Sequence, residues 1–185
     1  MGKLFVVMGR SAVGKSTIER QLEKSGEFNR IVSYTSRAKR NGEVDGVDYN
    51  YVSKEKFAEM LANGEFLEHA EYNGWFYGVT KNSIDLSKGN YLLVAECEGF
   101  KEIREELGKE NVVGIYLYLS DFWELLKRSI DRQPHATYAQ CMEICRRFLS
   151  DTETFAEVEK LATLKINNVD SAETVRIIKR FAKHE

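Results

Sequence analysis

The chain has 185 residues, of which 43% are hydrophobic and 30% charged, so it suits one domain with a substantial core and room for a small inserted lobe. Its 27 basic and 29 acidic residues give a net charge of −2, which argues against a general nucleic-acid binder or a membrane-surface protein. No apolar run approaches the length of a membrane span, and the first strand begins too early for a signal peptide to precede it. The three cysteines fit reduced thiols better than a metal site. We therefore expect a cytoplasmic protein.

The first predicted element is a buried strand, Leu4 to Met8, and a glycine-rich loop follows it. The loop fits the spacing G-x-x-x-x-G-K-[ST], with its fixed positions at Gly9, Gly14, Lys15 and Ser16. A helix is predicted from Thr17 to Lys24, because Ile18 and Leu22 share one apolar face. Strand, glycine loop and helix form the context that a phosphate-binding loop requires.

The chemistry of this loop follows from its residue types. Glycines let the backbone approach an anion closely, and successive N–H groups then point inward at an electropositive helix N-terminus. Lys15 supplies a mobile charge for the outer phosphates, and Ser16 offers a hydroxyl to Mg²⁺. The alternative is a glycine turn that happens to precede Lys-Ser, but four fixed positions with the right flanks favour a nucleoside triphosphate. The motif does not identify the phosphate acceptor.

The middle of the chain predicts short elements rather than the long ones of a parallel sheet. Strands are expected at 30–34 and 48–52 around a polar loop at 36–46, and a helix at 53–62. Residues 65–72 and 75–79 flank Asn73-Gly74, which is a hairpin signal. Short strands at this place indicate an inserted small lobe.

Alternation of strands and helices resumes after the hairpin. Buried strands are predicted at Tyr91–Cys97, Val112–Leu119 and Leu164–Asn167. Helices are predicted at 99–107, from Asp121 onward, at 138–161 and at 170–182, with a break over 132–137 around Pro134. This order predicts a parallel sheet covered on both faces, with ligands at the carboxyl ends of its strands.

Four segments, VSYTSRAKR, GEVDGVDYNYV, GEFLEHA and FYGVT, make the chain resemble the guanylate kinase family. The resemblance implies an α/β fold: a P-loop NTPase three-layer sandwich with a parallel core sheet, an inserted small mixed β lobe that binds the nucleoside monophosphate, and a helical lid. It implies one domain, 1–185, with its core at 1–32, 85–125 and 162–185, the lobe at 33–84 and the lid at about 126–148. The implied reaction is phosphorylation of GMP or dGMP to GDP by ATP with Mg²⁺.

The resemblance also assigns residues to roles. The ATP site would comprise Gly9, Arg10, Ser11, Ala12, Val13, Gly14, Lys15, Ser16, Thr17, Arg128 and Asn167, with Ser16 at the metal. The GMP site would comprise Ser33, Arg37, Arg40, Tyr49, Glu68, Tyr77, Val79 and Glu96. The groups that act on the transferring phosphoryl would be Lys15, Arg132, Arg146 and Arg147.

Physical chemistry supports the acceptor assignments. Two arginines and three hydroxyls suit a phosphate dianion, which takes fork-shaped cations and neutral donors. Charge alone would favour a solvated basic loop with two core tyrosines, but the P-loop upstream and the order of the segments favour a phosphate clamp. Glu68 can accept from both N1–H and the 2-amino group of guanine, whereas adenine presents an acceptor at N1.

The chain departs from the family pattern at three places. Val79 stands where the family carries Ser or Thr, so one contact to the base is expected to be missing, at a cost of about 1 kcal/mol. Val94 and Glu96 stand where the family carries two aspartates, and Val94, Glu96 and Glu98 would share one face of an extended strand. The lid after Arg132 is longer than the family norm.

These departures keep two other functions open. One is a P-loop kinase of the same fold that acts on another phosphorylated acceptor, a different nucleoside monophosphate or a sugar phosphate. The other is a non-catalytic binding module of the guanylate-kinase-like type, which the intact phosphate loop disfavours. In each case the expected partners are small molecules, nucleotides first, with no nucleic acid and no membrane, and the chain would be a monomer or a homodimer.

Overall fold

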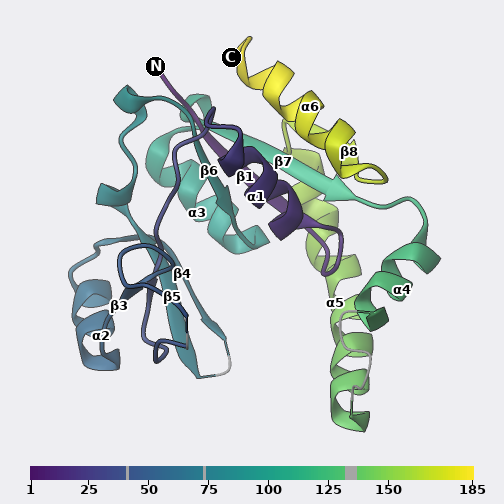
Figure 1. The fold of residues 1–185 in the computed structure, drawn as a ribbon, viewed down its shortest axis with the longest axis horizontal. Helices are drawn as coiled ribbons and strands as arrows, with labels where there is room; N and C mark the ends of the chain where they lie inside the picture. The colour runs from purple at the N-terminus through teal and green to yellow at the C-terminus, as the bar shows by residue number, and fades with distance from the viewer. Residues whose placement is uncertain (41, 73, 132–136) are drawn as a thin grey trace.

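The computed structural model describes residues 1–185 apart from 41, 73 and 132–136, and apart from the side chains of 72, 143, 147, 149–154 and 156–158. Its core is a four-stranded sheet in the order β6-β1-β7-β8 (Figure 1). All three strand pairs are parallel. The strands are β1 (Leu4–Gly9), β6 (Tyr91–Val94), β7 (Val112–Tyr118) and β8 (Leu164–Asn167). β1 lies inside the sheet and is buried along its whole length, as its unbroken apolar run predicts.

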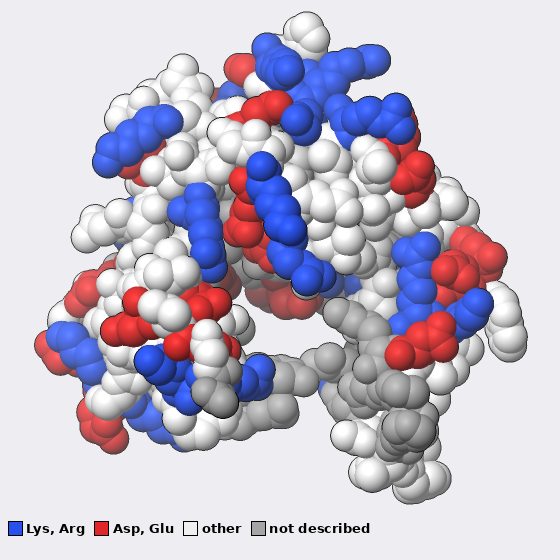
Figure 2. Space-filling model, viewed as in Figure 1, with Lys and Arg blue, Asp and Glu red and all other residues white. Residues whose placement is uncertain are grey.

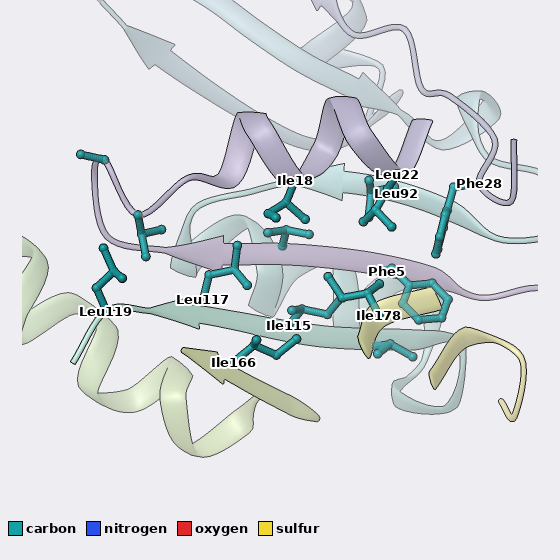
Figure 3. Packing of buried hydrophobic residues seen from close by; sticks show 14 of the residues in the cluster. Phe5, Ile18, Leu22, Phe28, Leu92, Ile115, Leu117, Leu119, Ile166 and Ile178 are labelled. Atoms are coloured by element: carbon teal, nitrogen blue, oxygen red, sulfur yellow. The ribbon is translucent and has the colours of Figure 1, made fainter. Parts of the chain in front are cut away.

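Helices cover both faces of this sheet, which confirms the predicted three-layer sandwich. α1 (Lys15–Lys24) and α6 (Ser171–Ala182) lie on one face, where Ile18, Leu22 and Ile178 pack on Phe5 and Ile115 (Figure 3). α3 (Cys97–Leu107) and α5 (Tyr138–Leu161) contribute to a second cluster of buried residues on the other face. Full burial of one such side chain stabilises the fold by about 1.5–3 kcal/mol. The sheet is therefore a rigid platform for the loops at its carboxyl edge.

A second sheet, with the order β3-β2-β5-β4, forms the lobe at lower left in Figure 1. Its strands are β2 (Tyr34–Thr35), β3 (Asn50–Tyr51), β4 (Phe66–Tyr72) and β5 (Trp75–Thr80). β2 pairs parallel with β3 and antiparallel with β5, so the sheet is mixed. α2 (Lys54–Ala62) packs on it through Phe57 and Met60, and the Ser53 hydroxyl caps this helix by accepting from the Lys56 N–H. The lobe thus has a small core of its own.

The remaining elements connect these parts. Three short 3₁₀ helices are η1 (Lys81–Ser83), η2 (Leu86–Lys88) and η3 (Lys109–Asn111). α4 (Phe122–Asp131) follows β7, and the Asp121 carboxylate caps its N-terminus by accepting from the N–H groups of Trp123 and Glu124. α4 and α5 contact each other and extend beyond the core (Figure 1). Within the described residues, no helix has the length and apolar character that a membrane span requires.

The structure corrects several predicted boundaries. The expected strand at 30–34 is wrong, since only Tyr34–Thr35 forms a strand there, and the strand at 48–52 shrinks to Asn50–Tyr51. The expected strand Tyr91–Cys97 ends at Val94. α1 begins at Lys15 rather than Thr17, and the predicted break at 132–137 falls largely outside the described residues.

The error at the end of β6 has a clear cause. Ala95 and Cys97 are both buried in the core cluster although neither belongs to the strand. Their apolar character therefore reflects burial and does not show that the strand continues. Glu96 is extended and precedes the first turn of α3, which starts at Cys97. Val94, Glu96 and Glu98 therefore do not share one face of a strand, as the extended reading required.

Candidate active site

The glycine-rich loop joins β1 to α1 at the carboxyl edge of the core sheet. Gly9 and Gly14 have φ values of 150° and 106°, and Ala12 is left-handed at 62°. A left-handed conformation costs a non-glycine residue about 1–2 kcal/mol, so the loop holds Ala12 under strain. The Lys15 ammonium donates to the carbonyl oxygens of Gly9 and Arg10, the latter at 3.3 Å. Carbonyl groups of the loop thus hold the ammonium group of Lys15 in place.

Asn168, which follows β8 at the same carboxyl edge of the sheet, supports this loop, and sequence analysis missed it. Its buried side-chain amide donates to the Val13 carbonyl at 2.8 Å, and its amide oxygen accepts from the Thr174 hydroxyl at 2.8 Å. A Cβ atom on Gly14 would lie 2.6 Å from the same amide nitrogen. Glycine at position 14 is therefore required by close approach as well as by φ. The only sequence signal was an asparagine just after the last strand.

A cavity of about 510 Å³ lies over the loop, and residues of the first two turns of α1 and of α4 also line it. Its lining consists of Arg10, Ser11, Ala12, Gly14, Lys15, Ser16, Thr17, Arg20, Glu96, Arg128 and Asp131. Four of these residues are basic and two are acidic, so the cavity suits an anion. Arg128 is held by Glu124, whose carboxylate accepts from its Nε at 2.8 Å. We name this space the donor cavity.

A second cavity of about 640 Å³ lies between the lobe and the core, and we name it the acceptor cavity. The predicted acceptor residues that line it are Ser33, Tyr49, Glu68, Tyr77 and Glu96. Arg146, from α5, lines it as well, whereas it was predicted to act on the phosphoryl group. Figure 2 shows an opening between the lobe and the α4–α5 pair, with basic side chains along part of its edge. The lobe and the α4–α5 pair, which we name the lid helices, thus flank one space.

The two cavities share three lining residues, Ser11, Lys15 and Glu96. A group bound in one cavity therefore meets the same lysine and the same carboxylate as a group bound in the other. Transfer between two bound substrates needs this kind of juxtaposition, because positioning can supply a large part of the barrier reduction. Glu96 lies there because β6 stops two residues earlier and turns into α3.

Glu68 is the most perturbed carboxyl in the acceptor cavity. Burial, with smaller contributions from Glu102 and Glu96, raises its pKa to about 7. A carboxyl near neutrality in a cleft is a recurrent feature of functional sites. Near neutral pH, Glu68 is therefore balanced between an ionised form that accepts two hydrogen bonds and a protonated form that cannot.

Arg37 is tied to a residue that sequence analysis missed, Glu43. The Glu43 carboxylate accepts from Arg37 at 2.8 Å, from the Arg40 N–H at 2.7 Å and from the Tyr51 hydroxyl at 2.7 Å. The bond from Arg37, with that from the Arg40 backbone, lowers the pKa of Glu43 to about 2, and the Glu43 contact raises the pKa of Arg37. Burial and Glu43 raise the pKa of Tyr51 to about 12. Only the position of an acid three residues after Arg40 signalled this role.

Not every predicted site residue lines a cavity. Arg40 is exposed, and Asn167 bonds Ser120 through both ends of its amide. Val79 is fully buried in the core cluster and pairs with Glu68 across β4 and β5, and the hydroxyl of its neighbour Thr80 bonds Ser83. Arg132 lies outside the described residues, as does the side chain of Arg147.

The donor set at the loop fits Mg²⁺. The described part of the chain holds no group of three or more His, Cys, Asp or Glu side chains that could cage a metal. Mg²⁺ rarely needs such a cage, because it binds through one or two oxygen ligands of the protein together with substrate phosphates and water. The Ser16 hydroxyl and the Glu96 carboxylate line the donor cavity and are oxygen ligands of this kind.

A phosphate loop whose lysine also borders a second cavity, under an inserted lobe and beside a helical lid, defines a P-loop nucleotide kinase. Comparison with known proteins narrows this class. A family model for guanylate kinase matches residues 1–184. The chain belongs to the guanylate kinase family.

Individual relatives agree with this membership. A guanylate kinase of Clostridioides difficile is 39% identical over 165 residues, which cover 86% of this chain and 70% of that protein. One from Enterococcus faecalis is 31% identical over 198 residues, which cover 99% and 95%. The crystal structure of guanylate kinase from Anaplasma phagocytophilum superposes with a TM-score of 0.71 at 28% identity and covers 99% of this chain and 85% of that one.

Proposed function

We propose that the protein transfers the γ-phosphoryl group of ATP to GMP or dGMP and so produces ADP and GDP. Membership of the guanylate kinase family supports the pair of substrates. The single observation that carries the proposal for this chain is that the donor and acceptor cavities share lining residues, and that Lys15 is one of them. The protein binds nucleotides as small-molecule partners, and we extend the proposal to a cytoplasmic monomer or homodimer that does not bind nucleic acid.

In the donor cavity, the N–H groups of the loop and the start of α1 would hold the polyphosphate. Lys15 would leave its carbonyl partners and move with the transferring phosphoryl group, whose charge it offsets. Ser16 and Glu96 are the residues that would hold Mg²⁺ or its water, and the ion would supply positive charge that offsets the charge of the polyphosphate. Glu96 takes this part because the side chain of Val94 has no oxygen ligand.

In the acceptor cavity, Glu68 would accept from N1–H and the 2-amino group of guanine in its ionised form. Ser33, Tyr49 and Tyr77 would donate to the phosphate of GMP. Arg37 and Arg40 would join them once the phosphate competes with Glu43 for the Arg37 guanidinium. Arg146, and the lid arginines outside the described residues, would complete the charge around the transferring group.

An acceptor screen tests this function. ADP release from ATP is measured with GMP, dGMP, AMP, CMP, UMP and sugar phosphates as acceptors, each at the same concentration. We expect GMP and dGMP to be preferred, because only guanine presents paired donors to Glu68. Preference for any other acceptor would contradict the assignment and support a related kinase instead.

Lys15→Ala is the matched inactive variant for the screen. It removes the ammonium that borders both cavities and leaves the apolar core of the fold unchanged. We expect phosphoryl transfer to be abolished while the circular dichroism spectrum and the melting temperature stay near those of the wild type. Turnover at the wild-type rate in Lys15→Ala would show that the loop is not the site of transfer.

A further inference from the structure

A glycine lies within α3, in the part of this helix that faces the acceptor cavity. Glycine weakens a helix, because it loses more backbone freedom on folding than any other residue. Gly99 is the third residue of α3 and is not among the glycines with positive φ, so backbone conformation does not require it. The reason for a glycine at this position therefore lies in what surrounds its Cα atom.

The side chain of Glu68 occupies the space that a side chain at position 99 would need. A Cβ atom on Gly99 would lie 3.3 Å from Oε2 of Glu68 and 3.6 Å from its Cβ atom. The first distance is shorter than an ordinary van der Waals contact, so the carboxylate would have to move by a few tenths of an ångström. Both residues line the acceptor cavity. The Glu68 carboxylate thus keeps its place because α3 presents bare backbone to it.

A register shift in β4 brings Glu68 to this helix. The pairing of β4 with β5 changes register between Phe66 and Glu68, as at a β-bulge, which re-aims the side chains that follow it. Phe66 packs in the core of the lobe, whereas Leu67 is buried in the cluster that includes Phe100 of α3. Glu68, the next residue, lies on α3 as well. Two successive side chains of β4 therefore face the core, where a regular strand would send them to opposite faces.

The electrostatic surroundings of Glu68 agree with this position. Burial is the main cause that raises its pKa to about 7, and the charges of Glu102 and Glu96 add to the rise. Glu96 directly precedes α3, and Glu102 belongs to the second turn of this helix. The carboxylate that we assign to guanine is therefore part of the lobe in sequence but is surrounded by the start of a core helix.

We propose that Gly99 is a positioning residue for base recognition, because its lack of a side chain lets the Glu68 carboxylate lie against α3 in the place from which it accepts from guanine. The core, and not the lobe alone, then sets the position of the group that selects the base. The inference rests on the proposed function, since it requires that Glu68 binds guanine. It concerns the acceptor cavity and predicts no change in the affinity for ATP.

The test is the Kd of Gly99→Ala for GMP, and separately for ATP with Mg²⁺, by isothermal titration calorimetry at pH 8, where Glu68 is mostly ionised. Alanine adds a single Cβ atom beside Oε2 of Glu68. We expect GMP to bind about tenfold more weakly, as loss of one hydrogen bond to a charged group requires. We expect ATP to bind as in the wild type, and the variant to melt at the wild-type temperature or above it, because alanine favours a helix.

Glu68→Ala provides the matched background, because it has no carboxylate that a new Cβ atom could displace. We expect Gly99→Ala to leave the Kd for GMP unchanged in this background, so the two substitutions should not be additive. Gly99→Val places a larger side chain at the same point. We expect it to weaken GMP binding more than Gly99→Ala does, again with no change in the affinity for ATP.

The outcomes separate this inference from the proposed function. Wild-type affinity for GMP in Gly99→Ala would overturn the inference and leave the proposed function intact. An equal loss with glutamate and with alanine at position 68 would overturn it too, because Gly99 would then act without the carboxylate. A lower melting temperature with equal losses for GMP and ATP would reduce Gly99 to a structural part of α3. Failure of the wild type to bind GMP would overturn the proposed function and the inference with it.

Discussion

Single residues at the acceptor cavity make its chemistry depend on pH. The pKa of Glu68 is raised to about 7, mainly by burial, and guanine recognition requires the ionised carboxylate. Ionisation falls as the pH drops through 7, so binding should weaken in the same range. At pH 6 roughly one molecule in ten would carry the ionised form, by the titration of a single group.

We therefore expect the Kd for GMP to rise about tenfold between pH 8 and pH 6. The phosphate of GMP titrates near pH 6 as well, and Glu68→Gln separates the two effects because it keeps only the phosphate titration. Calorimetric titrations of both proteins across this range make the comparison. A wild-type profile parallel to that of Glu68→Gln would contradict the role given to Glu68.

The same shift carries a stability prediction of defined sign. Since the folded-state pKa of Glu68 lies above the ordinary 4.5, its contribution is fully present below pH 4.5 and is lost as the pH rises through 7. Glu68→Gln should therefore gain stability relative to the wild type as the pH is raised from 5 to 8. Urea unfolding at the two values measures this difference, and a constant difference would contradict the shift.

Asn168 gives a second prediction at the scale of one residue. Asn168→Ala leaves the Val13 carbonyl and the Thr174 hydroxyl without their buried partner, which should lower the free energy of unfolding by about 1–3 kcal/mol. ATP should bind more weakly too, because the loop loses its support. Asn167→Ala, which among the described residues removes side-chain bonds to exposed Ser120, is the control for unfolding and should cost less. Equal losses in the two variants would contradict the support by Asn168.

At the scale of elements, the platform beneath the loop depends on how its helices begin. The Asp170 carboxylate caps α6 by accepting from the N–H groups of Ala172 and Glu173, at 2.8 and 3.4 Å. α6 packs on α1, the helix that follows the phosphate loop. The cap therefore stabilises the layer that positions the loop.

We expect Asp170→Ala to lower the free energy of unfolding by about 1 kcal/mol, whereas Asp170→Asn should be close to the wild type because asparagine is an equally good cap. Chemical denaturation of the three proteins under one set of conditions measures both values. If Asp170→Asn were as destabilising as Asp170→Ala, a charge effect rather than the cap would explain the loss.

At the scale of the whole molecule, the lobe and the lid helices flank the space over the core (Figure 1). We expect them to approach each other when both nucleotides bind, since closure would exclude water from the transferring phosphoryl group. Small-angle scattering should show a lower radius of gyration with an inert ATP analogue and GMP together than with either one. An unchanged radius with both cavities occupied would contradict closure.

The sequence predicts this molecule unevenly, and the reasons are physical. The run Leu4–Met8 and the spacing from Gly9 to Ser16 predict strand, loop and helix correctly, because hydrophobic period and glycine geometry act locally. The end of β6 could not be predicted, since buried Ala95 and Cys97 look the same to a sequence pattern in a strand or in a first helical turn.

The site shows the same division. Residues such as Lys15 and Glu68 carry a motif or a charge with a definite chemical use, and both line the cavities. Glu43 and Asn168 were missed because they act on other site residues through side-chain hydrogen bonds that span a loop or the fold. Only the folded arrangement reveals such partners.

Phosphorus NMR of the protein with equal concentrations of ATP and GMP and excess Mg²⁺ tests the central claim, direct transfer across the wall formed by Ser11, Lys15 and Glu96. The account predicts that the γ-phosphate and GMP resonances decline together while those of ADP and GDP grow, with no inorganic phosphate. Inorganic phosphate in place of GDP, or ATP left intact in the presence of GMP, would contradict it.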